Sequence, residues 1–269
     1  PPPVDQEMQV SSPTATPLPP TSTPLPPTPS STASPIPPSP TATLPQPQII
    51  GYSVADRPLE VYQFGTGPIE KMIVAGIHGG YEYNTVDLAD ELIAYLEAHP
   101  DVVPADHTLY ILRAFNIDGY ERSKWRAGRA NENNVDLNRN FPSNWQRYWP
   151  KAGCWGYLDI EGGTSAASEP ETQALIEFIN SHEIIALISY HSAALGIFAG
   201  GQPPDAASLS LAESVAAVSD YPYPPLNTGC LFTGQFVDWV SDQGIAGVDI
   251  ELTNHQDTDF EINLAICWK

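Results

Sequence analysis

The sequence predicts an α/β sandwich around a mixed, largely parallel central sheet, preceded by a long spacer. From residue 49 onward, short apolar runs alternate with segments that show the helical spacing of apolar positions. The first 47 residues contain 17 Pro and 15 Ser or Thr and almost no large apolar side chains. We therefore expect residues 1–48 to form a disordered or polyproline spacer and residues 49–269 to form one globular domain.

The first half of the domain begins with strands. Residues 49–64 alternate apolar and polar side chains around the turn Ala55-Asp56-Arg57-Pro58, which predicts a β-hairpin. The next expected elements are a buried strand over 71–77, a helix over 85–98, a strand over 108–114 and loops up to about residue 167.

The second half continues the alternation. Ser168-Glu169-Pro170-Glu171 has the pattern of a capping box, with Ser168 as N-cap, and predicts the start of a helix. The elements expected after it are a strand over 184–189, helices over about 205–219 and 231–243, a strand over 246–251 and a helix over 258–268.

Polar side chains stand at three of the predicted strand ends, namely His78, His191 and Glu251. In α/β sheets functional groups collect beyond the carboxyl ends of strands. Glu82 lies close to His78 after a Gly-rich turn. Two histidines and a carboxylate suit a zinc site, although a single histidine after a strand is more often structural.

The few basic residues are clustered. Five of the eleven fall within eighteen consecutive positions, and they are Arg122, Lys124, Arg126, Arg129 and Arg139. On a chain of net charge −21, this cluster indicates an anion-binding site, since a guanidinium can hold both oxygens of a carboxylate. Ion pairs with the many Asp and Glu side chains are the alternative, and we assign Arg122, Lys124 and Arg129 to such pairs.

Composition also bounds the environment and the partners. The acidic balance argues against nucleic acid as a partner, and no apolar stretch reaches transmembrane length. The spacer suits a secreted protein or one tethered at the cell surface, and we expect a monomer. Three cysteines permit one disulfide and one free thiol, with Cys154 and Cys230 as the favoured pair over Cys267.

Several separated motifs resemble, in the same order, those of bacterial M14-type zinc carboxypeptidases. They are His78 with Glu82, Asn116-Ile-Asp118-Gly119, Trp125-Arg126, Asp136-Leu-Asn138-Arg139-Asn-Phe141, Ser189-Tyr-His191-Ser and Ile250-Glu251-Leu252. The resemblance runs from about residue 50 to the end of the chain. It implies a three-layer α/β/α sandwich and hydrolysis of the C-terminal amide bond of a peptide.

The resemblance also implies roles for single residues. His78, Glu82 and His191 would bind one Zn²⁺, and Glu251 would act as the general base. Arg126 would stabilise the oxyanion. Asn138 and Arg139 would hold the terminal carboxylate of the substrate, and Val237, beside Asp238, would line its side-chain pocket.

Three features depart from the family pattern. Three residues separate His78 from Glu82 where the family usually has two, and the two glycines among them can absorb the extra residue. The mobile tyrosine of the family stays unassigned, since Cys230 falls near its place. Only eighteen residues follow Glu251, so we expect a shortened C-terminal helix.

The resemblance leaves the substrate open. An apolar Val237 favours an apolar terminal residue, whereas an acid at this place favours a basic one. Bacterial relatives cut the γ-D-glutamyl–diaminopimelate bond of peptidoglycan with the same core, so a stem peptide is an equal candidate. The rival functions are a zinc deacylase of the aspartoacylase or desuccinylase type, acting on small N-acyl amino acids, and a non-catalytic peptide- or cell-wall-binding homologue.

Overall fold

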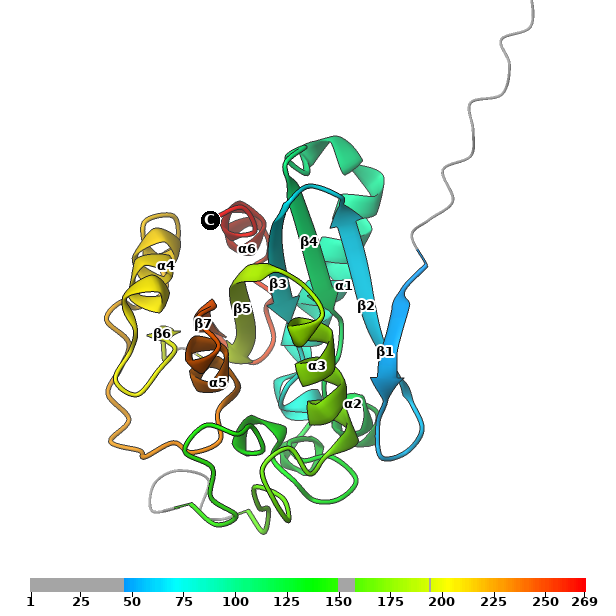
Figure 1. Cartoon of the computed structure of the whole chain (residues 1–269), viewed down its shortest axis with the longest axis vertical. Helices are drawn as coiled ribbons and strands as arrows, with labels where there is room; N and C mark the ends of the chain where they lie inside the picture. Colours follow the sequence, from blue (N-terminus) through cyan, green and yellow to red (C-terminus); the bar gives the residue numbers. More distant parts are fainter. Residues whose placement is uncertain (1–45, 150–157, 194) are drawn as a thin grey trace, which may run out of the picture. The chain divides into compact units, whose positions relative to one another are not determined.

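The computed structural model describes residues 46–149, 158–193 and 195–269, and most of the predicted spacer lies outside them. In this part of the chain seven strands form one sheet in the order β1-β2-β4-β3-β5-β7-β6 (Figure 1). The strands are β1 Gln48–Tyr52, β2 Pro58–Gly65, β3 Ile69–Val74, β4 His107–Leu112, β5 Ile184–Ser192, β6 Ile197–Ala199 and β7 Ala246–Leu252.

The sheet is mixed, with a parallel centre. β4, β3, β5 and β7 are parallel neighbours, while β1 and β2 at one edge and β6 at the other pair antiparallel. The expected hairpin at the start of the domain is confirmed as β1 and β2. Since the central strands are parallel, their carboxyl ends meet at one edge of the sheet.

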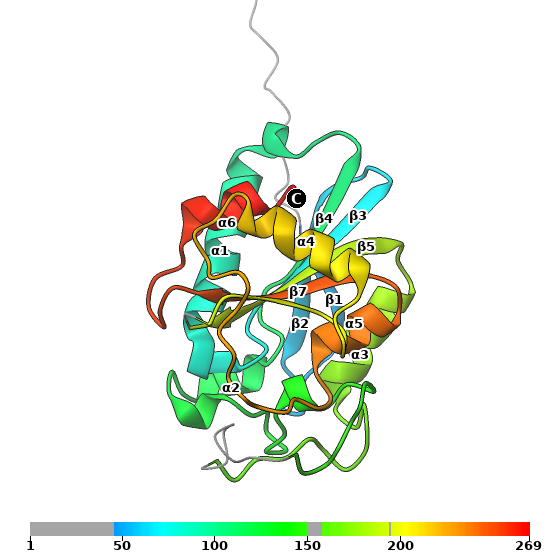
Figure 2. The ribbon, with the colours of Figure 1, turned by 90° about the vertical axis from the view of Figure 1, so that its left-hand side faces the viewer.

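Helices cover both faces of the sheet. Their bounds are α1 Tyr83–Ala98, α2 Ile117–Arg122, α3 Pro170–Asn180, α4 Ala206–Ala216, α5 Phe236–Asp242 and α6 Phe260–Ile266. Residues of α1, α4 and α6 share one apolar core with the sheet, and residues of α3 and α5 share the other. Figure 2 shows these two groups of helices on opposite sides of the strands, which gives the expected three-layer sandwich.

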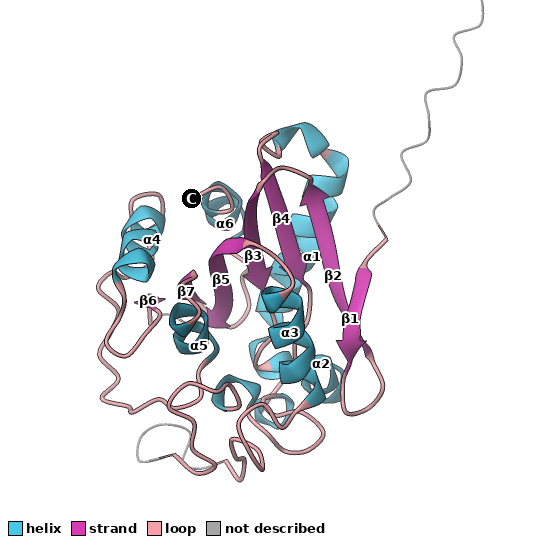
Figure 3. Ribbon diagram, viewed as in Figure 1, coloured by secondary structure: helices cyan, strands magenta, loops and turns pink. Residues whose placement is uncertain are grey.

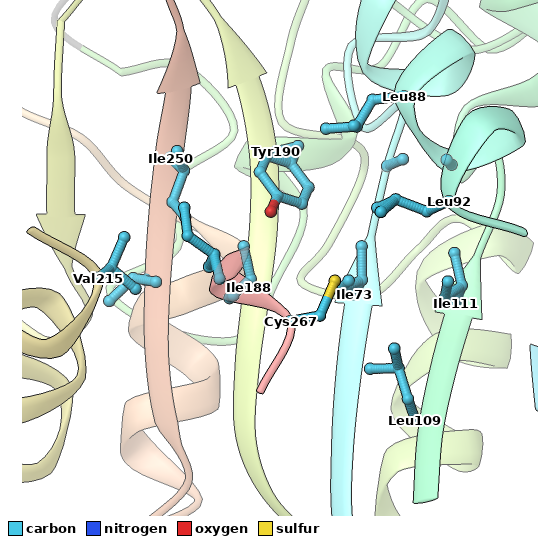
Figure 4. Close-up of a cluster of buried hydrophobic side chains, with 14 of the residues drawn as sticks. Ile73, Leu88, Leu92, Leu109, Ile111, Ile188, Tyr190, Val215, Ile250 and Cys267 are labelled. Atoms are coloured by element: carbon cyan, nitrogen blue, oxygen red, sulfur yellow. The ribbon is translucent and has the colours of Figure 1, made fainter. Parts of the chain in front are cut away.

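The alternation of side chains along each strand builds the two cores. On β3, Ile73 packs into the core beneath α1, whereas its neighbours Met72 and Val74 point into the core beneath α3. Figure 4 shows Ile73 of β3 in the first core together with Leu88 and Leu92 of α1. Each buried aliphatic side chain of this kind contributes about 1.5–3 kcal/mol to folding.

The predicted N-cap of α3 was wrong by one residue. α3 begins at Pro170, its N-cap is Glu169, and no side chain caps it. The Ser168 hydroxyl donates instead to Glu169 Oε1 at 2.6 Å and accepts from Asn140 Nδ2 at 3.0 Å. Ser168 therefore joins the helix to the preceding loop and does not form a capping box.

The predicted helix over 231–243 was too long at its start. α5 begins only at Phe236, because Gly234 has φ +64°, in the left-handed region that ends a helix. The short edge strand β6 was not predicted, since three residues carry too little alternation to be recognised. Loops gather below the strands in Figure 3, at the carboxyl ends of the central strands.

The state of the cysteines and the character of the helices bear on the cellular compartment of the protein. Cys230 is disulfide-bonded and Cys267 is a buried free thiol, while Cys154, the predicted partner of Cys230, lies outside the described residues. Across residues 46–149, 158–193 and 195–269, no helix has the length and apolar character needed to cross a membrane.

Candidate active site

Three neighbouring parallel strands deliver the candidate catalytic residues to one place. His78 follows β3, His191 lies near the end of β5, and Glu251 lies near the end of β7. His191 and Glu251 are direct partners in the register of β5 and β7. The sheet therefore brings together residues that are far apart in the sequence.

His78, Glu82 and His191 form a compact buried cluster. Glu82 Oε1 lies 2.8 Å from His78 Nδ1, and Glu82 Oε2 lies 3.2 Å from His191 Nδ1. The two Nδ1 atoms are 3.2 Å apart, and one ligand atom from each residue fits within 4.8 Å. Two imidazole nitrogens and a carboxylate that converge in this way fit the three protein ligands of a zinc site with an open fourth position.

The extra residue between His78 and Glu82 is taken up by a tight turn. Residues Gly79–Glu82 form a 3-10 turn in which Gly79 has φ +47°. At Gly80 a Cβ would overlap the Ser123 carbonyl, so only glycine fits there. Glu82 thereby reaches both histidines despite the longer spacing.

Carboxylates lie within ion-pair distance of the outer nitrogens of both histidines. Asp136 Oδ1 lies 3.4 Å from His78 Nε2, and Asp249 Oδ1 lies 3.2 Å from His191 Nε2. Burial alone would raise the pKa of Asp136, but the adjacent Arg129 and His78 hold the pKa well below its usual range. Such carboxylates orient metal-binding imidazoles with Nδ1 toward the metal.

The structure corrects the assignment of the arginines. Arg126 is exposed, its guanidinium lies over the Trp125 ring, and it is not among the residues that line the cavity. Arg129, which we had assigned to local ion pairs, is 1 % exposed and reaches the cluster. Its Nη2 lies 2.9 Å from His78 Nε2 and 3.0 Å from Asp136 Oδ2.

Arg139 and Asn138 form a separate basic site. The Arg139 guanidinium lies between the rings of Trp149 and Phe232, at 5.3 and 5.0 Å from their centroids. Its buried Nε has no hydrogen-bond partner among the described residues. Burial lowers the pKa of Arg139 to about 10, so it stays charged at neutral pH. Asn138 Oδ1 accepts from the Phe236 backbone, which leaves the amide nitrogen as its available donor.

One cavity of about 470 Å³ contains these groups together. Its wall includes the three candidate zinc ligands, Glu251, Arg129, Asn138, Arg139 and Val237. Glu251 Oε2 is buried and has no hydrogen-bond partner in the described part of the chain. Burial and the nearby Glu82 carboxylate raise the pKa of Glu251 to about 8 in the absence of a cation.

The comparison with known families agrees with this geometry. The sequence matches the zinc carboxypeptidase model, peptidase M14, over residues 42–262. The chain belongs to the M14 zinc carboxypeptidases. Members of this family depend on zinc, and the cluster of His78, Glu82 and His191 is the metal-binding group that the described residues offer.

Curated M14 relatives include animal and bacterial proteins. The chain is 31 % identical to human mast cell carboxypeptidase A over 163 residues, which cover 51 % of this chain and 38 % of that protein. It is 28 % identical to murein peptide amidase A of Escherichia coli K12 over 186 residues, which cover 67 % and 69 % of the two chains. The chain thus spans well under half of the mast cell enzyme.

Solved M14 structures share the fold. Bovine thrombin-activatable fibrinolysis inhibitor, in complex with tick carboxypeptidase inhibitor, superposes with a TM-score of 0.65 at 23 % identity, covering 83 % of this chain and 87 % of that one. Murein-tripeptide amidase from Escherichia coli O157 gives 0.58 at 23 % identity, covering 85 % and 94 %.

Sequence reasoning missed the place of two residues at this candidate site, Arg129 and Asp249. Arg129 was passed over, although the nearby Asp136 needs a buried cation as partner. Asp249 precedes Glu251 by two positions, a spacing that places both on one face of β7. Asp238, the acid weighed as the alternative to Val237 for the side-chain pocket, lines the cavity together with it.

Proposed function

We propose that this protein is a zinc-dependent hydrolase that removes the C-terminal residue of a peptide. The observation that carries the proposal is the single cavity that joins a cluster of zinc ligands, a carboxylate and a buried arginine with an unused donor. The cluster suits cleavage of an amide bond, and the arginine suits the free carboxylate of a chain end.

Each group has a role in this reaction. His78, Glu82 and His191 would hold zinc, which as a Lewis acid would lower the pKa of a bound water. Glu251 takes the proton of the attacking water and passes it to the leaving amine. Arg129 faces the negative charge that develops on the scissile carbonyl oxygen. Arg139 and Asn138 fix the terminal carboxylate and so align the last amide bond with the cluster.

A peptide panel assayed with and without a chelator tests the activity. We expect metal-dependent release of C-terminal residues, and no release from either ordinary or stem peptides would refute the proposal. N-acyl amino acids belong in the same panel, because their exclusive cleavage would identify a deacylase instead.

A matched pair of variants tests the corrected arginine. Arg129→Ala should lower kcat about 100-fold or more, in the range seen when a donor to an oxyanion is removed. Arg126→Ala should stay within about threefold of the wild type, because its side chain is exposed and outside the cavity. A large loss of kcat in Arg126→Ala and a small one in Arg129→Ala would support Arg126 as the residue that stabilises the oxyanion.

For the side-chain pocket we propose a preference for a terminal residue that carries a cationic group. Asp238 is 4 % exposed and accepts hydrogen bonds only from neutral donors: Gly201 N at 2.9 Å, Gln202 Nε2 at 2.6 Å and Gln235 Nε2 at 3.0 Å. No cation lies within ion-pair distance of it among the described side chains. A buried carboxylate is costly without a countercharge, which an amino group of the substrate can supply.

Lysine, diaminopimelate and phenylalanine as terminal residues separate the options. We expect the first two to be preferred, which keeps the stem peptide of peptidoglycan as the second candidate substrate beside ordinary peptides, in line with the murein peptide amidase relative. Asp238→Asn should remove most of the preference, whereas Asp242→Asn, an exposed site on the same helix, should leave it intact. A wild-type preference for phenylalanine would support the role first given to Val237.

We also propose that the protein works outside the cytoplasm. The disulfide at Cys230 supports this location, because structural disulfides persist in oxidising compartments. Fractionation of the producing cells, with the redox state of Cys230 measured by thiol labelling, tests it. A reduced Cys230 in the cytoplasmic fraction would contradict the proposal.

A further inference from the structure

His255 lines the same cavity but has no part in the roles described so far. It lies in the loop after β7, and its Nδ1 is 2.9 Å from Ser192 Oγ. Its ring packs edge-on against Tyr81, with 5.3 Å between the centroids. Ser192 follows His191 and Tyr81 precedes Glu82, so His255 contacts the sequence neighbours of two candidate zinc ligands.

A chain of hydrogen bonds fixes which nitrogen of His255 carries the proton. Asn84 Nδ2 donates to the carbonyls of Asn254 and Asp257, at 2.8 and 2.9 Å, and this fixes the orientation of the amide. Asn84 Oδ1 then accepts the only proton of the Ser192 hydroxyl, at 2.9 Å. Ser192 Oγ can therefore only accept from His255, whose neutral form carries its proton on Nδ1.

The opposite nitrogen of His255 is left as a hydrogen-bond acceptor. Nε2 carries a lone pair in this tautomer, and it has no partner among the described residues. The side chain is exposed at the edge of the cavity, so a bound ligand can reach it. In its neutral form His255 thus offers one hydrogen-bond acceptor, Nε2, with a defined direction.

The structural neighbours of His255 and those of the carboxylate anchor pack on opposite faces of the sheet. Leu137 and Phe141, which flank Asn138 and Arg139, pack into the core beneath α3 and α5. Asn84 belongs to the first turn of α1, which covers the other face. Since Arg139, the zinc ligands and His255 line one cavity, a peptide held by its terminal carboxylate at Arg139 can extend past the zinc ligands toward His255.

We propose that His255 is a substrate-positioning residue that accepts a hydrogen bond from the peptide N–H on the acyl side of the scissile bond. The inference rests on the proposed function and defines its substrate class more closely. The substrates are peptides whose penultimate residue carries an acylated amino group and so presents an amide N–H. Asn84 and Ser192 act through His255 by holding it in the accepting tautomer.

A substrate pair separates this role from a purely structural one. One member is an N-acetyl dipeptide, and in the other a CH2 group replaces the N–H of the penultimate residue. The ratio of their kcat/KM values should fall about two- to tenfold in His255→Ala relative to the wild type, as expected for one neutral hydrogen bond. Gln256→Ala, an exposed neighbour in the same loop, should keep the wild-type ratio.

A residue that only supports the loop would lower both kcat/KM values equally and leave their ratio unchanged, and this result would overturn the proposal. If neither peptide is cleaved, the proposed function fails. The hydrogen-bond chain from Asn84 through Ser192 to His255 can still be tested, by determining which nitrogen of His255 carries the proton. Nitrogen-15 NMR of the full chain should show His255 protonated on Nδ1, and Ser192→Ala should shift the proton toward Nε2. A proton on Nε2 of His255 in the wild type would contradict the tautomer assigned from this hydrogen-bond chain.

Discussion

The buried carboxyl group of Glu171 makes the stability of this protein depend on pH. Glu171 lies in the first turn of α3, is fully buried, and accepts a hydrogen bond from the Val54 backbone at 3.2 Å. Burial raises its pKa from 4.5 to about 7, and the Asp118 carboxylate adds to the rise. No candidate metal ligand touches it, so its titration can be measured on the metal-free protein.

The upward shift of this pKa determines whether the free energy of unfolding rises or falls with pH. A carboxyl group whose pKa is higher in the folded state takes up a proton on folding between the two values. Its contribution to stability is therefore complete below about pH 4.5 and is lost as the pH rises through about 7. At roughly 1.36 kcal/mol per pH unit, the difference between 4.5 and about 7 amounts to about 3 kcal/mol. About 2 kcal/mol of this should disappear between about pH 5 and pH 8.

Replacement by an uncharged isostere should remove this dependence. We expect the free energy of unfolding of Glu171→Gln, relative to the wild type, to rise by about 2 kcal/mol from about pH 5 to pH 8. Urea unfolding in the presence of a chelator measures it, and Glu177→Gln, an exposed site on α3, is the control. A difference between Glu171→Gln and the wild type that stays constant with pH, or falls, would refute the reasoning.

Three further changes have expected outcomes. Glu251→Gln should lower kcat by about 100- to 10,000-fold while zinc content by atomic absorption stays unchanged, and equal kcat values would remove Glu251 from the role of base. Asp136→Asn should weaken zinc binding by about 10- to 100-fold in equilibrium dialysis, because His78 loses its orienting carboxylate; unchanged affinity would contradict this. Gly234→Ala should destabilise the protein by about 1–2 kcal/mol or more and raise KM, because Gly234 has φ +64° and a Cβ would overlap the Arg139 carbonyl; an unaltered unfolding curve would count against it.

The sequence allowed the order and type of the main elements to be predicted, because the alternation of strands and helices is carried by local apolar patterns. His78, His191 and Glu251 could be placed at one edge of the sheet for the same reason. Their mutual distances depend on the order of β3, β5 and β7, which local patterns do not contain.

The errors arose where a side-chain contact of the folded structure decides the outcome. Trp125-Arg126 matched a family pattern, but burial selects Arg129, whose guanidinium is held by Asp136 from the next turn of the chain. The early start predicted for α5 failed because the Phe236 backbone N–H is bound by Asn138, a contact across ninety-eight positions. Neither contact can be read from local spacing.

The buried thiol of Cys267 has a consequence for how the protein matures under oxidising conditions. An unpaired cysteine can attack an existing disulfide and produce wrong pairings. Such thiol–disulfide exchange requires a thiolate that can reach the bond it attacks. In the native fold Cys267 is 3 % exposed, and burial raises its pKa to about 12, so attack on the Cys230 disulfide is suppressed. That protection exists only once the chain after α6 has docked against the sheet. The correct disulfide must therefore form before α6 docks. A mutation that destabilises the docking of α6 would lower the yield of correctly oxidised protein, while the specific activity of the correctly oxidised molecules stays unchanged.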